Sequence, residues 1–167
     1  MTKKLDFLIG ASFADLIFQP TAEIIAPDNM LIINFKNEKI LYSIHAVCSV
    51  RINKGNKFLL NSSDEFVDEN HSYLMEDNVD KSILKINIDK TKSILAKEKV
   101  ESALIEECGD LIISFSNGIR LMIMPDCCIE EFEYYRILGC KKLRTIILVT
   151  CHEDKVVIEN KFGWHFQ

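Results

Sequence analysis

Cysteine and histidine side chains offer the clearest starting points for chemistry in this chain. Cys151 is followed directly by His152, and Cys127 is followed by Cys128. A cysteine-based hydrolase needs a thiolate and an imidazole that converge in space. Neighbouring residues of a strand point to opposite faces, so Cys151 and His152 cannot pair with each other on one strand. The sequence singles out no other partner among the remaining histidines, which are His45, His71 and His165.

Metal, cofactor and phosphate sites have no recognisable pattern in the sequence. Zinc would favour spacings such as Cys-x-x-Cys or His-x-x-x-His, and neither occurs. There is no calcium-loop pattern, no glycine-rich phosphate loop and no Gly-x-Ser-x-Gly. The six cysteines lack the spacing of a disulfide scaffold, which favours buried thiols in a reducing cytoplasm. We therefore expect no catalytic residue, cofactor or metal, and a cysteine-dependent enzyme is the least supported alternative.

Acidic residues are distributed unevenly along the chain. The net charge of −5 argues against direct nucleic-acid binding, because phosphate recognition needs a basic patch. No apolar run approaches the roughly 18 to 20 residues that span a bilayer, so no membrane partner is expected. Between Asn61 and Asp80 there are seven acidic residues and no lysine or arginine: Asp64, Glu65, Asp68, Glu69, Glu76, Asp77 and Asp80. A second acidic group comprises Asp126, Glu130, Glu131 and Glu133.

These acidic groups have two interpretations. Most charged runs are solvated surface without a specific role. Seven acids without a compensating base are nevertheless suited to attract and hold a strongly basic protein. Tyr134 and Tyr135 follow Glu133, and aromatic anchors among charges are typical of an interface. The alternative is that alternate side chains between Phe132 and Leu138 belong to the core.

A β-hairpin organises the elements that would position these residues. Leu111–Phe115 and Ile119–Ile123 have the composition of half-buried strands, and Asn117-Gly118 between them is a strong hairpin signal. A two-residue turn would mix polar and apolar residues on each face. A three-residue loop, with Gly118 in the left-handed conformation, pairs Phe115 with Ile119, Ile113 with Leu121 and Leu111 with Ile123. That register gives one wholly apolar face, so we prefer it.

A fainter copy of this hairpin lies eighty residues earlier. The shift aligns Leu31, Ile32, Ile33, Phe35, Asn37, Leu41 and Cys48 with Leu111, Ile112, Ile113, Phe115, Asn117, Leu121 and Cys128. Two amphipathic hairpins share Leu and Ile by chance, but the common Phe-x-Asn and the distant cysteine favour an internal duplication. The two units, about 29–60 and 109–138, could bury their apolar faces together or lie side by side in one sheet.

The remaining apolar runs predict further strands. These are Lys57–Leu60, Lys81–Ile88, Val100–Glu107, Ile129–Leu138, Ile146–Cys151 and Val156–Ile158. Lys90–Lys97 is expected to form a short helix, Leu5–Phe18 a short helix or a turn into a strand, and the acidic segment an exposed loop with at most one helical turn. The sequence therefore predicts a single β-rich α+β domain over 1–167, with antiparallel sheets built from two related hairpin units and one or two short helices.

The main hairpin and the residues after it resemble a pattern of small bacterial immunity proteins, which accompany contact-dependent growth-inhibition toxins. The matching residues are Gly109-Asp-Leu-Ile-Ile-Ser-Phe-Ser-Asn-Gly118, Leu121–Met124, Asp126 and Phe132-Glu-Tyr-Tyr-Arg-Ile137. The family pattern usually has a tryptophan where this chain has Tyr134. The resemblance implies two copies of the hairpin unit and an inhibitor that binds its toxin in the cytoplasm without catalysis. It carries over no functional residue.

We therefore expect a non-enzymatic immunity protein that occludes the active site of a cognate, basic toxin domain, such as a nuclease. The expected partner-binding residues are Asp64, Glu65, Asp68, Glu69, Glu76, Asp77, Asp80, Glu130, Glu131, Glu133 and Tyr134. The alternative is a small-ligand-binding β domain that uses the apolar space between the two hairpin units. The sequence does not specify the oligomeric state.

Overall fold

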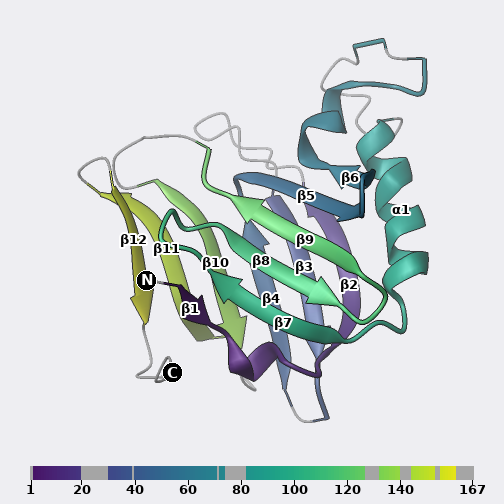
Figure 1. Cartoon of the computed structure of the whole chain (residues 1–167). Helices are drawn as coiled ribbons and strands as arrows, with labels where there is room; N and C mark the ends of the chain where they lie inside the picture. Colours follow the sequence, from purple (N-terminus) through teal and green to yellow (C-terminus); the bar gives the residue numbers. More distant parts are fainter. Residues whose placement is uncertain are drawn as a thin grey trace.

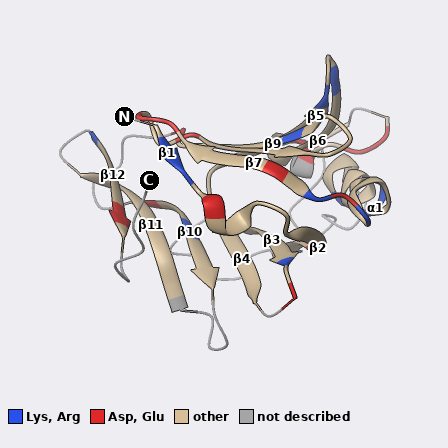
Figure 2. Cartoon of the chain, turned by 60° about the horizontal axis from the view of Figure 1, so that its bottom comes forward, with Lys and Arg blue, Asp and Glu red and all other residues tan. Residues whose placement is uncertain are grey.

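Two antiparallel six-stranded sheets pack face to face (Figure 1, Figure 2). The computed structural model describes residues 2–19, 30–38, 40–70, 72–73, 82–126, 132–139, 144–152 and 155–160. Sheet A has the order β1 (Lys3–Lys4), β7 (Val100–Ile105), β8 (Leu111–Phe115), β9 (Ile119–Met124), β5 (Ser49–Lys54), β6 (Lys57–Asn61). Sheet B has the order β12 (Lys155–Asn160), β11 (Arg144–His152), β10 (Glu133–Gly139), β4 (Leu41–Ala46), β3 (Met30–Lys36), β2 (Ser12–Gln19). The described helices are α1 (Ile83–Leu95) and the 3-10 helices η1 (Asp6–Leu8) and η2 (Ser62–Phe66). The predicted fold class is confirmed.

The main hairpin, β8–β9, has the register that its apolar alternation predicts. Leu111 pairs with Ile123 and Ile113 with Leu121, and all four side chains are fully buried. Gly118 closes the three-residue loop with a φ of 77°, a left-handed conformation that costs glycine little. The turn is held by the Asn117 side chain, whose Oδ1 accepts a hydrogen bond from the Ile119 backbone N–H at 3.1 Å.

The earlier hairpin, β3–β4, repeats this turn chemistry with a longer loop. Asn37 Oδ1 accepts a hydrogen bond from the Ile40 backbone N–H at 2.9 Å, as Asn117 does in the second hairpin. The longer loop shifts the register, so that Ile33 pairs with Ile44. Ile44 therefore takes the buried place that Leu121 has in β9, while Leu41 is 41% exposed. The sequence alignment that matches Leu41 with Leu121 is therefore wrong for the structure, because the two residues do not occupy equivalent positions.

The two hairpins lie in different sheets and bury their apolar faces together. Phe35 of β3 and Phe115 of β8 are stacked, with ring centroids 6.1 Å apart. The halves also exchange strands: β5–β6 leaves sheet B and pairs with β9, while β10–β11 pairs with β4 (Figure 1). The first half thus gives the meander β2–β3–β4 to sheet B, and β1 with the hairpin β5–β6 to sheet A. The second half gives the meander β7–β8–β9 to sheet A and the meander β10–β11–β12 to sheet B. Descent of the halves from a duplication stays a prediction.

The helix α1 replaces the strand predicted at Lys81–Ile88, and that prediction is wrong. Ser82 caps the helix, because its Oγ accepts a hydrogen bond from the Lys85 backbone N–H at 3.2 Å. The short run of alternating isoleucines is compatible with a strand, but the buried residues follow a helical period: Leu84, Ile88, Thr91 and Leu95. The helix lies beside the edge strands β6 and β2 (Figure 1) and contacts both. Thr91 Oγ1 donates to the Leu59 carbonyl at 3.4 Å, and Lys92 pairs with Asp15 at 2.8 Å.

The other strand predictions are confirmed as β6, β7, β10, β11 and β12. Leu5–Phe18 contains both of the elements considered for it, since η1 is followed by β2. The helix expected at Lys90–Lys97 is the second half of α1, which ends at Leu95. Across the described ranges, no helix has both the length and the apolar character that crossing a bilayer requires.

Candidate partner-binding surface

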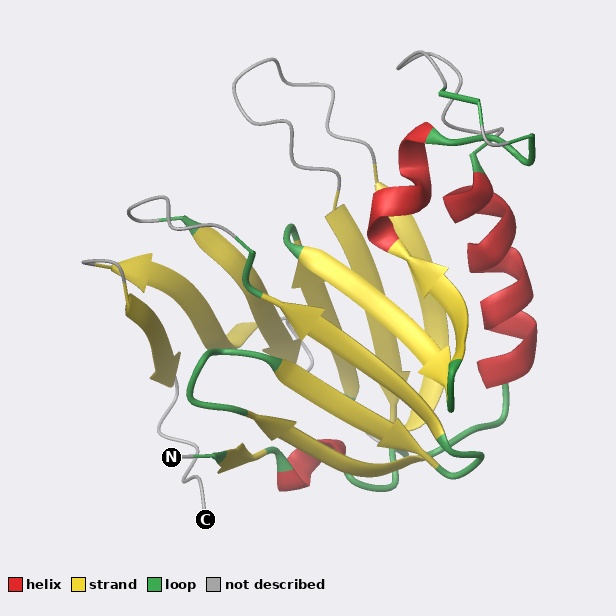
Figure 3. Ribbon diagram, turned by 45° about the horizontal axis from the view of Figure 1, so that its top comes forward, coloured by secondary structure: helices red, strands yellow, loops and turns green. Residues whose placement is uncertain are grey.

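The acidic segment begins directly where β6 ends, and hydrogen bonds fix its first turn. The side chain of Asn61 caps η2, with Oδ1 accepting from the Ser63 backbone N–H at 3.4 Å. Ser62 Oγ accepts a hydrogen bond from the Val50 backbone N–H at 2.9 Å, which ties η2 to β5. Figure 3 shows η2 beside α1 at one end of the sandwich. The segment therefore starts from a fixed position.

A small turn follows η2 and displays an aromatic ring. Val67 and Tyr73 form an antiparallel bridge, and the Asp68 carboxylate spans the turn between them. Asp68 Oδ1 accepts hydrogen bonds from the backbone N–H groups of Asn70, at 2.8 Å, and Ser72, at 2.9 Å. The side chain of Tyr73 is 88% exposed. Asp68 thus shapes the turn that presents Tyr73 to solvent.

Three of the predicted acidic residues lie together in this described stretch. Glu69 is exposed, whereas Asp64 and Asp68 are half-buried. Partial burial raises the pKa of the Asp64 carboxyl above its ordinary value. The other predicted members of the segment lie outside the described residues or have no described side chain: Glu65, Glu76, Asp77 and Asp80.

Tyr73 is the residue of this surface that sequence reasoning missed. Polar residues precede it, but Leu74 and Met75 follow it directly, so that Tyr73 begins a short apolar run. No local signal in the sequence therefore separates an exposed Tyr73 from a core residue, and its role as an anchor follows from its exposure in the structure.

Tyr134, the predicted aromatic anchor, belongs to the core. Its side chain is 2% exposed and lies against Phe132, with ring centroids 5.6 Å apart. Tyr134 and its neighbour Tyr135 both point inward, because a register irregularity in β10 falls between Glu133 and Tyr135. The prediction interpreted an aromatic residue among acidic ones as an interface anchor, and it is wrong for Tyr134.

The second acidic group is only partly described. The Glu133 carboxylate accepts a hydrogen bond from Arg136 Nε, so its charge is paired locally. Asp126 is exposed, and its carboxylate accepts a hydrogen bond from the Ser49 backbone N–H at 3.0 Å. Glu130 and Glu131 lie outside the described residues. Glu133 and Asp126 thus form hydrogen bonds within the chain itself.

The chemically suggestive cysteines and histidines do not converge in the described residues. Cys151 is buried and His152 is exposed, on opposite sides of β11 as predicted. His45 lies 3.1 Å from Ser43 Oγ through Nε2; burial and then the nearby Arg136 lower its pKa, which favours the neutral ring. Cys48 is buried and Cys108 exposed. Outside the described residues lie Cys127, Cys128, Cys140, His71 and His165.

Within the described ranges, one group of side chains could supply metal ligands. Ligand atoms of Glu106, Cys108 and Asp110 lie within 4.8 Å of one another in the turn between β7 and β8. The Cys108 thiol is 4.0 Å from a Glu106 carboxylate oxygen and can donate a weak hydrogen bond to it. Two carboxylates and a thiol could hold a divalent cation, but exposed groups of this kind are common without one.

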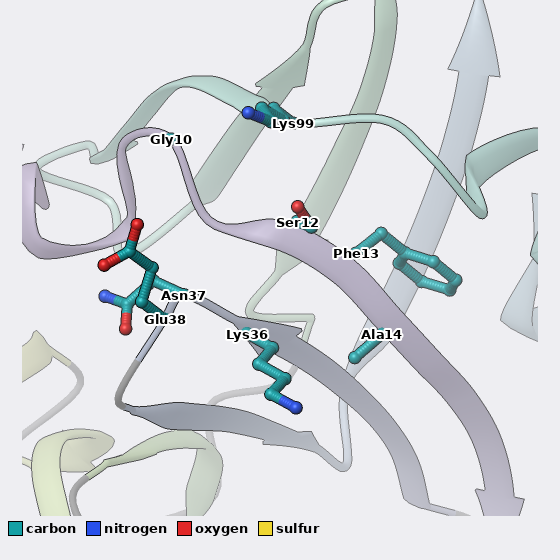
Figure 4. Close-up of a pocket in the computed structure, with 8 residues that line it drawn as sticks. All are labelled: Gly10, Ser12, Phe13, Ala14, Lys36, Asn37, Glu38 and Lys99. Carbon is teal, nitrogen blue, oxygen red and sulfur yellow. The ribbon is translucent and has the colours of Figure 1, made fainter.

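An open hollow of about 450 Å³ lies where β2 begins, beside the β3–β4 turn. Figure 4 shows its lining residues: Gly10, Ser12, Phe13, Ala14, Lys36, Asn37, Glu38 and Lys99. The amino groups of Lys36 and Lys99 lie on either side of β2 and point apart (Figure 4). The polar groups therefore do not converge on one ligand position, unlike those of a typical binding pocket.

The acidic stretch around Tyr73 is thus the feature that best combines charge, exposure and an aromatic anchor. The hollow offers space without converging polar groups, and the two described core cysteines are buried. Comparison with known proteins adds no relative: no family model, no curated protein and no solved structure matches this chain.

Proposed function

We propose that this chain is an immunity-type inhibitor, which binds a basic toxin domain through its acidic segment and occludes the toxin's active site. One observation supports this function above the others. Residues 58–80 contain seven acids and no lysine or arginine. The described part of this stretch lies beside α1 at one end of the sandwich (Figure 1), and its Tyr73 is 88% exposed.

The charge of the segment suits a toxin that acts on nucleic acid. Such an enzyme is basic where it binds phosphate, so a surface of carboxylates can occupy the same site. Opposite charges on the two proteins also accelerate their association. Salt reduces this acceleration, because at 0.1 M it screens interactions between charges more than about 10 Å apart. Glu69, exposed in the turn beside Tyr73, is suited to this role.

Tyr73 supplies the apolar contact that charges alone do not give. An aromatic ring that moves from solvent into a pocket of the partner is a frequent interface hot spot. The two hydrogen bonds accepted by Asp68 already hold the turn, so less backbone freedom is lost on binding. The segment thus offers long-range attraction and a fixed short-range anchor.

The first experiment is a pull-down from the source cell with the full chain as bait and mass spectrometry as readout. We expect one basic toxin fragment, and its activity on nucleic acid should be lost when the chain is added. If the bait recovers no toxin from cells that are known to express their toxins, that result contradicts the proposal.

Binding measurements with charge variants then test the surface itself. Asp64→Lys combined with Glu69→Lys should weaken toxin binding by roughly tenfold or more, and the remaining binding should depend less on salt. Tyr73→Ala should weaken it by a similar factor with little change in salt dependence. Asp6→Lys is the matched control, since Asp6 is an exposed acid in η1, outside the acidic segment. Wild-type affinity in the first two variants would exclude this surface.

A small-ligand-binding domain without catalytic activity is the alternative, and the hollow beside β2 is the observation that favours it. The space first considered, between the two hairpins, is occupied in part by the stacked Phe35 and Phe115 rings. Mass spectrometry of the denatured, purified protein would test this alternative. A stoichiometric small molecule, lost in a Ser12→Trp variant that fills the hollow, would replace the inhibitor proposal.

A further inference from the structure

Two arginines lie close together on the outer face of sheet A. Arg51 and Asn53 of β5 both point to this face, because they alternate with buried residues of the same strand. Asn53 pairs with Arg120 of β9, so Arg120 is the diagonal neighbour of Arg51. Backbones of diagonal neighbours are about 7–8 Å apart, a distance that long side chains bridge. Figure 2 shows the basic colour on β9 and on the β5–β6 hairpin.

Neither of these arginines forms an ion pair within the described part of the chain. The third arginine whose side chain the structure describes, Arg136 on sheet B, is paired with Glu133. Arg51 and Arg120 therefore keep their charge and their hydrogen-bond donors available for another group, whereas those of Arg136 are engaged.

Other charged side chains at this end of sheet A lie away from the two arginines. Glu101 is exposed on β7, and the whole of β8 separates that strand from β9. The Glu98 carboxylate accepts a hydrogen bond from Ser116 Oγ at 2.6 Å, next to the β8–β9 turn. Lys54 and Lys57 pair with each other in the opposite register, so they are not neighbours of the arginines on this face.

An exposed ring and unpaired polar atoms surround Arg51. Phe58 pairs with Asn53 and is 63% exposed. The Arg51 guanidinium lies over the Phe58 ring, 5.2 Å from its centroid, so the ring helps to orient the charge. Among the described residues, Arg51 Nε and Asn53 Oδ1 are buried without a hydrogen-bond partner. Such atoms are uncommon in folded proteins and can mark the place of a bound ion.

A hydroxyl group completes the set, since Ser114 of β8 is the register partner of Arg120. We call the five residues the arginine patch: Arg51, Asn53, Phe58, Ser114 and Arg120. Guanidinium groups match the oxygens of phosphate with two parallel hydrogen bonds. Aromatic rings and guanidinium planes also stack on nucleic-acid bases. The patch thus combines the groups that recognise a phosphate and a planar ring together.

We propose that the arginine patch binds a nucleoside phosphate, with the phosphate between Arg51 and Arg120 and the base stacked beside Phe58. A free nucleotide and the end of a single-stranded nucleic acid offer this same chemistry. The negative net charge of the chain opposes attraction from a distance, so binding depends on the local contacts and is weak. The site does not rest on the toxin proposal, because none of its residues belongs to the acidic segment.

Titration of the isotope-labelled full chain with adenosine 5′-monophosphate, followed through amide chemical shifts in NMR spectra, tests the site. The shifts should saturate with a Kd on the order of 1 mM or lower and centre on Arg51, Asn53 and Arg120. Adenosine and ribose 5-phosphate should each bind roughly tenfold more weakly, because each lacks one half of the ligand. Equal affinity for inorganic phosphate and the nucleotide would overturn the proposal, as would shifts centred elsewhere or no saturation.

A 5′-phosphorylated oligoadenylate distinguishes the two sources of this chemistry. Tighter binding of the oligonucleotide than of the mononucleotide would assign the end of a strand. Tighter binding of the mononucleotide would assign a free nucleotide.

Substitutions test the roles of the individual side chains. Arg51→Gln and Arg120→Gln should each weaken nucleotide binding by roughly tenfold, because each removes charge-assisted hydrogen bonds. Arg136→Gln is the matched control, since Arg136 is an exposed arginine on the outer face of sheet B. Phe58→Leu should weaken binding of the nucleotide and leave that of ribose 5-phosphate unchanged. Wild-type affinity in both patch arginine variants, with spectra that show them folded, would overturn the proposal.

Discussion

The two central hairpins share a sequence pattern and each buries one apolar face, but their turns differ. In β8–β9, Gly118 closes a three-residue loop and Leu121 is fully buried. In β3–β4 the loop is longer, and Ile44 rather than Leu41 faces the core. Both hairpins nevertheless bring a phenylalanine to the same point, where Phe35 stacks on Phe115. The apolar face is thus common to both hairpins, while the loop sets which residues form it.

The outer faces of the two sheets differ more than their inner faces do. The inner faces are uniformly apolar because they form one shared core. Outside, sheet A has Leu104, Ile112 and Met122 in the centre of a row that Lys4 and Arg51 bound, whereas sheet B places His45 and Arg136 in the centre of its row. Folding alone requires only the inner pattern, so the outer faces can differ in composition without a change of fold.

Breaking the contact between the hairpins should have the largest effect on stability. Phe35→Ala and Phe115→Ala should each lower the free energy of unfolding by about 3–5 kcal/mol. Similar values would support equivalent roles for the two rings. The double variant should lose about 0.5–1.5 kcal/mol less than the sum, because the stacked pair is lost once. Urea unfolding measures all three, with Phe→Leu variants as the milder series; strictly additive losses would argue against coupling.

Tyr135 links the two sheets and should have the next largest effect. Its hydroxyl donates a buried hydrogen bond to the Gly109 carbonyl, just before β8, at 2.7 Å. Tyr135→Phe leaves that carbonyl without this donor and should lower the free energy of unfolding by about 1–3 kcal/mol at pH 7. Urea midpoints measured against pH provide a second, independent readout.

Burial is the main cause that raises the Tyr135 pKa well above 10.0, so the folded state favours the neutral phenol. This contribution is fully present below the pKa of the unfolded chain, about 10, and is lost as the pH rises through the higher folded pKa. The wild type should therefore lose stability above about pH 10 more steeply than Tyr135→Phe. Identical alkaline slopes would show that another group controls the loss.

Substitutions at Gly118 measure how much the conformation of the β8–β9 turn contributes to stability, independently of the strands that it connects. A Cβ at this position would meet nothing within 4 Å, so the effect of Gly118→Ala comes from the backbone φ of 77° alone. We expect a loss of about 1 kcal/mol, because alanine is strained in the left-handed region. Gly118→Asn should recover part of it, since asparagine tolerates that conformation. Equal stability for all three residues in thermal unfolding would rule out strain at this turn.

The smallest effect on stability is expected for the ion pair between Asp15 of β2 and Lys92 of α1. Lys92 lowers the pKa of Asp15 mainly through their hydrogen bond, and both side chains are more than a third exposed. Asp15→Asn should therefore cost less than about 1 kcal/mol at pH 7. A lowered carboxyl pKa stabilises the fold above the unfolded value, so the difference should fade as the pH drops through the folded pKa. A difference that persists at full protonation, or is unaffected by salt, would exclude the ion pair as its cause.

Local patterns in the sequence predicted the parts of the fold that depend on few competing forces. Gly118 and the alternation on both sides of it specified β8–β9 with its register, because one face had to be wholly apolar. The same reasoning failed for Lys81–Ile88, where a few alternating isoleucines outweighed the helical spacing of Leu84 and Leu95. Ser82 was the missed signal, since it caps the helix that those leucines anchor.

The candidate surface was predicted less completely than the fold. Charge is visible in a sequence, so the acidic segment could be recognised before its structure was known. The burial of Tyr134 depends on an irregularity within β10, which no local pattern reveals. The exposure of Tyr73 depends on a turn held by Asp68, whose carboxylate had been assigned only to a partner. Both outcomes come from backbone geometry rather than from residue type.

The exchange of strands between the halves has a consequence for how the chain acquires its structure during synthesis. Ser49 pairs with Met124 and Ala46 with Tyr135, so both sheets join strands that are far apart in the sequence. The β5–β6 hairpin leaves the ribosome long before β9 is available to receive it. Its exposed edge must remain unpaired for that interval, and such edges invite aggregation. Completion of both sheets thus waits for the second half, which predicts slow, late and highly cooperative folding of the whole chain.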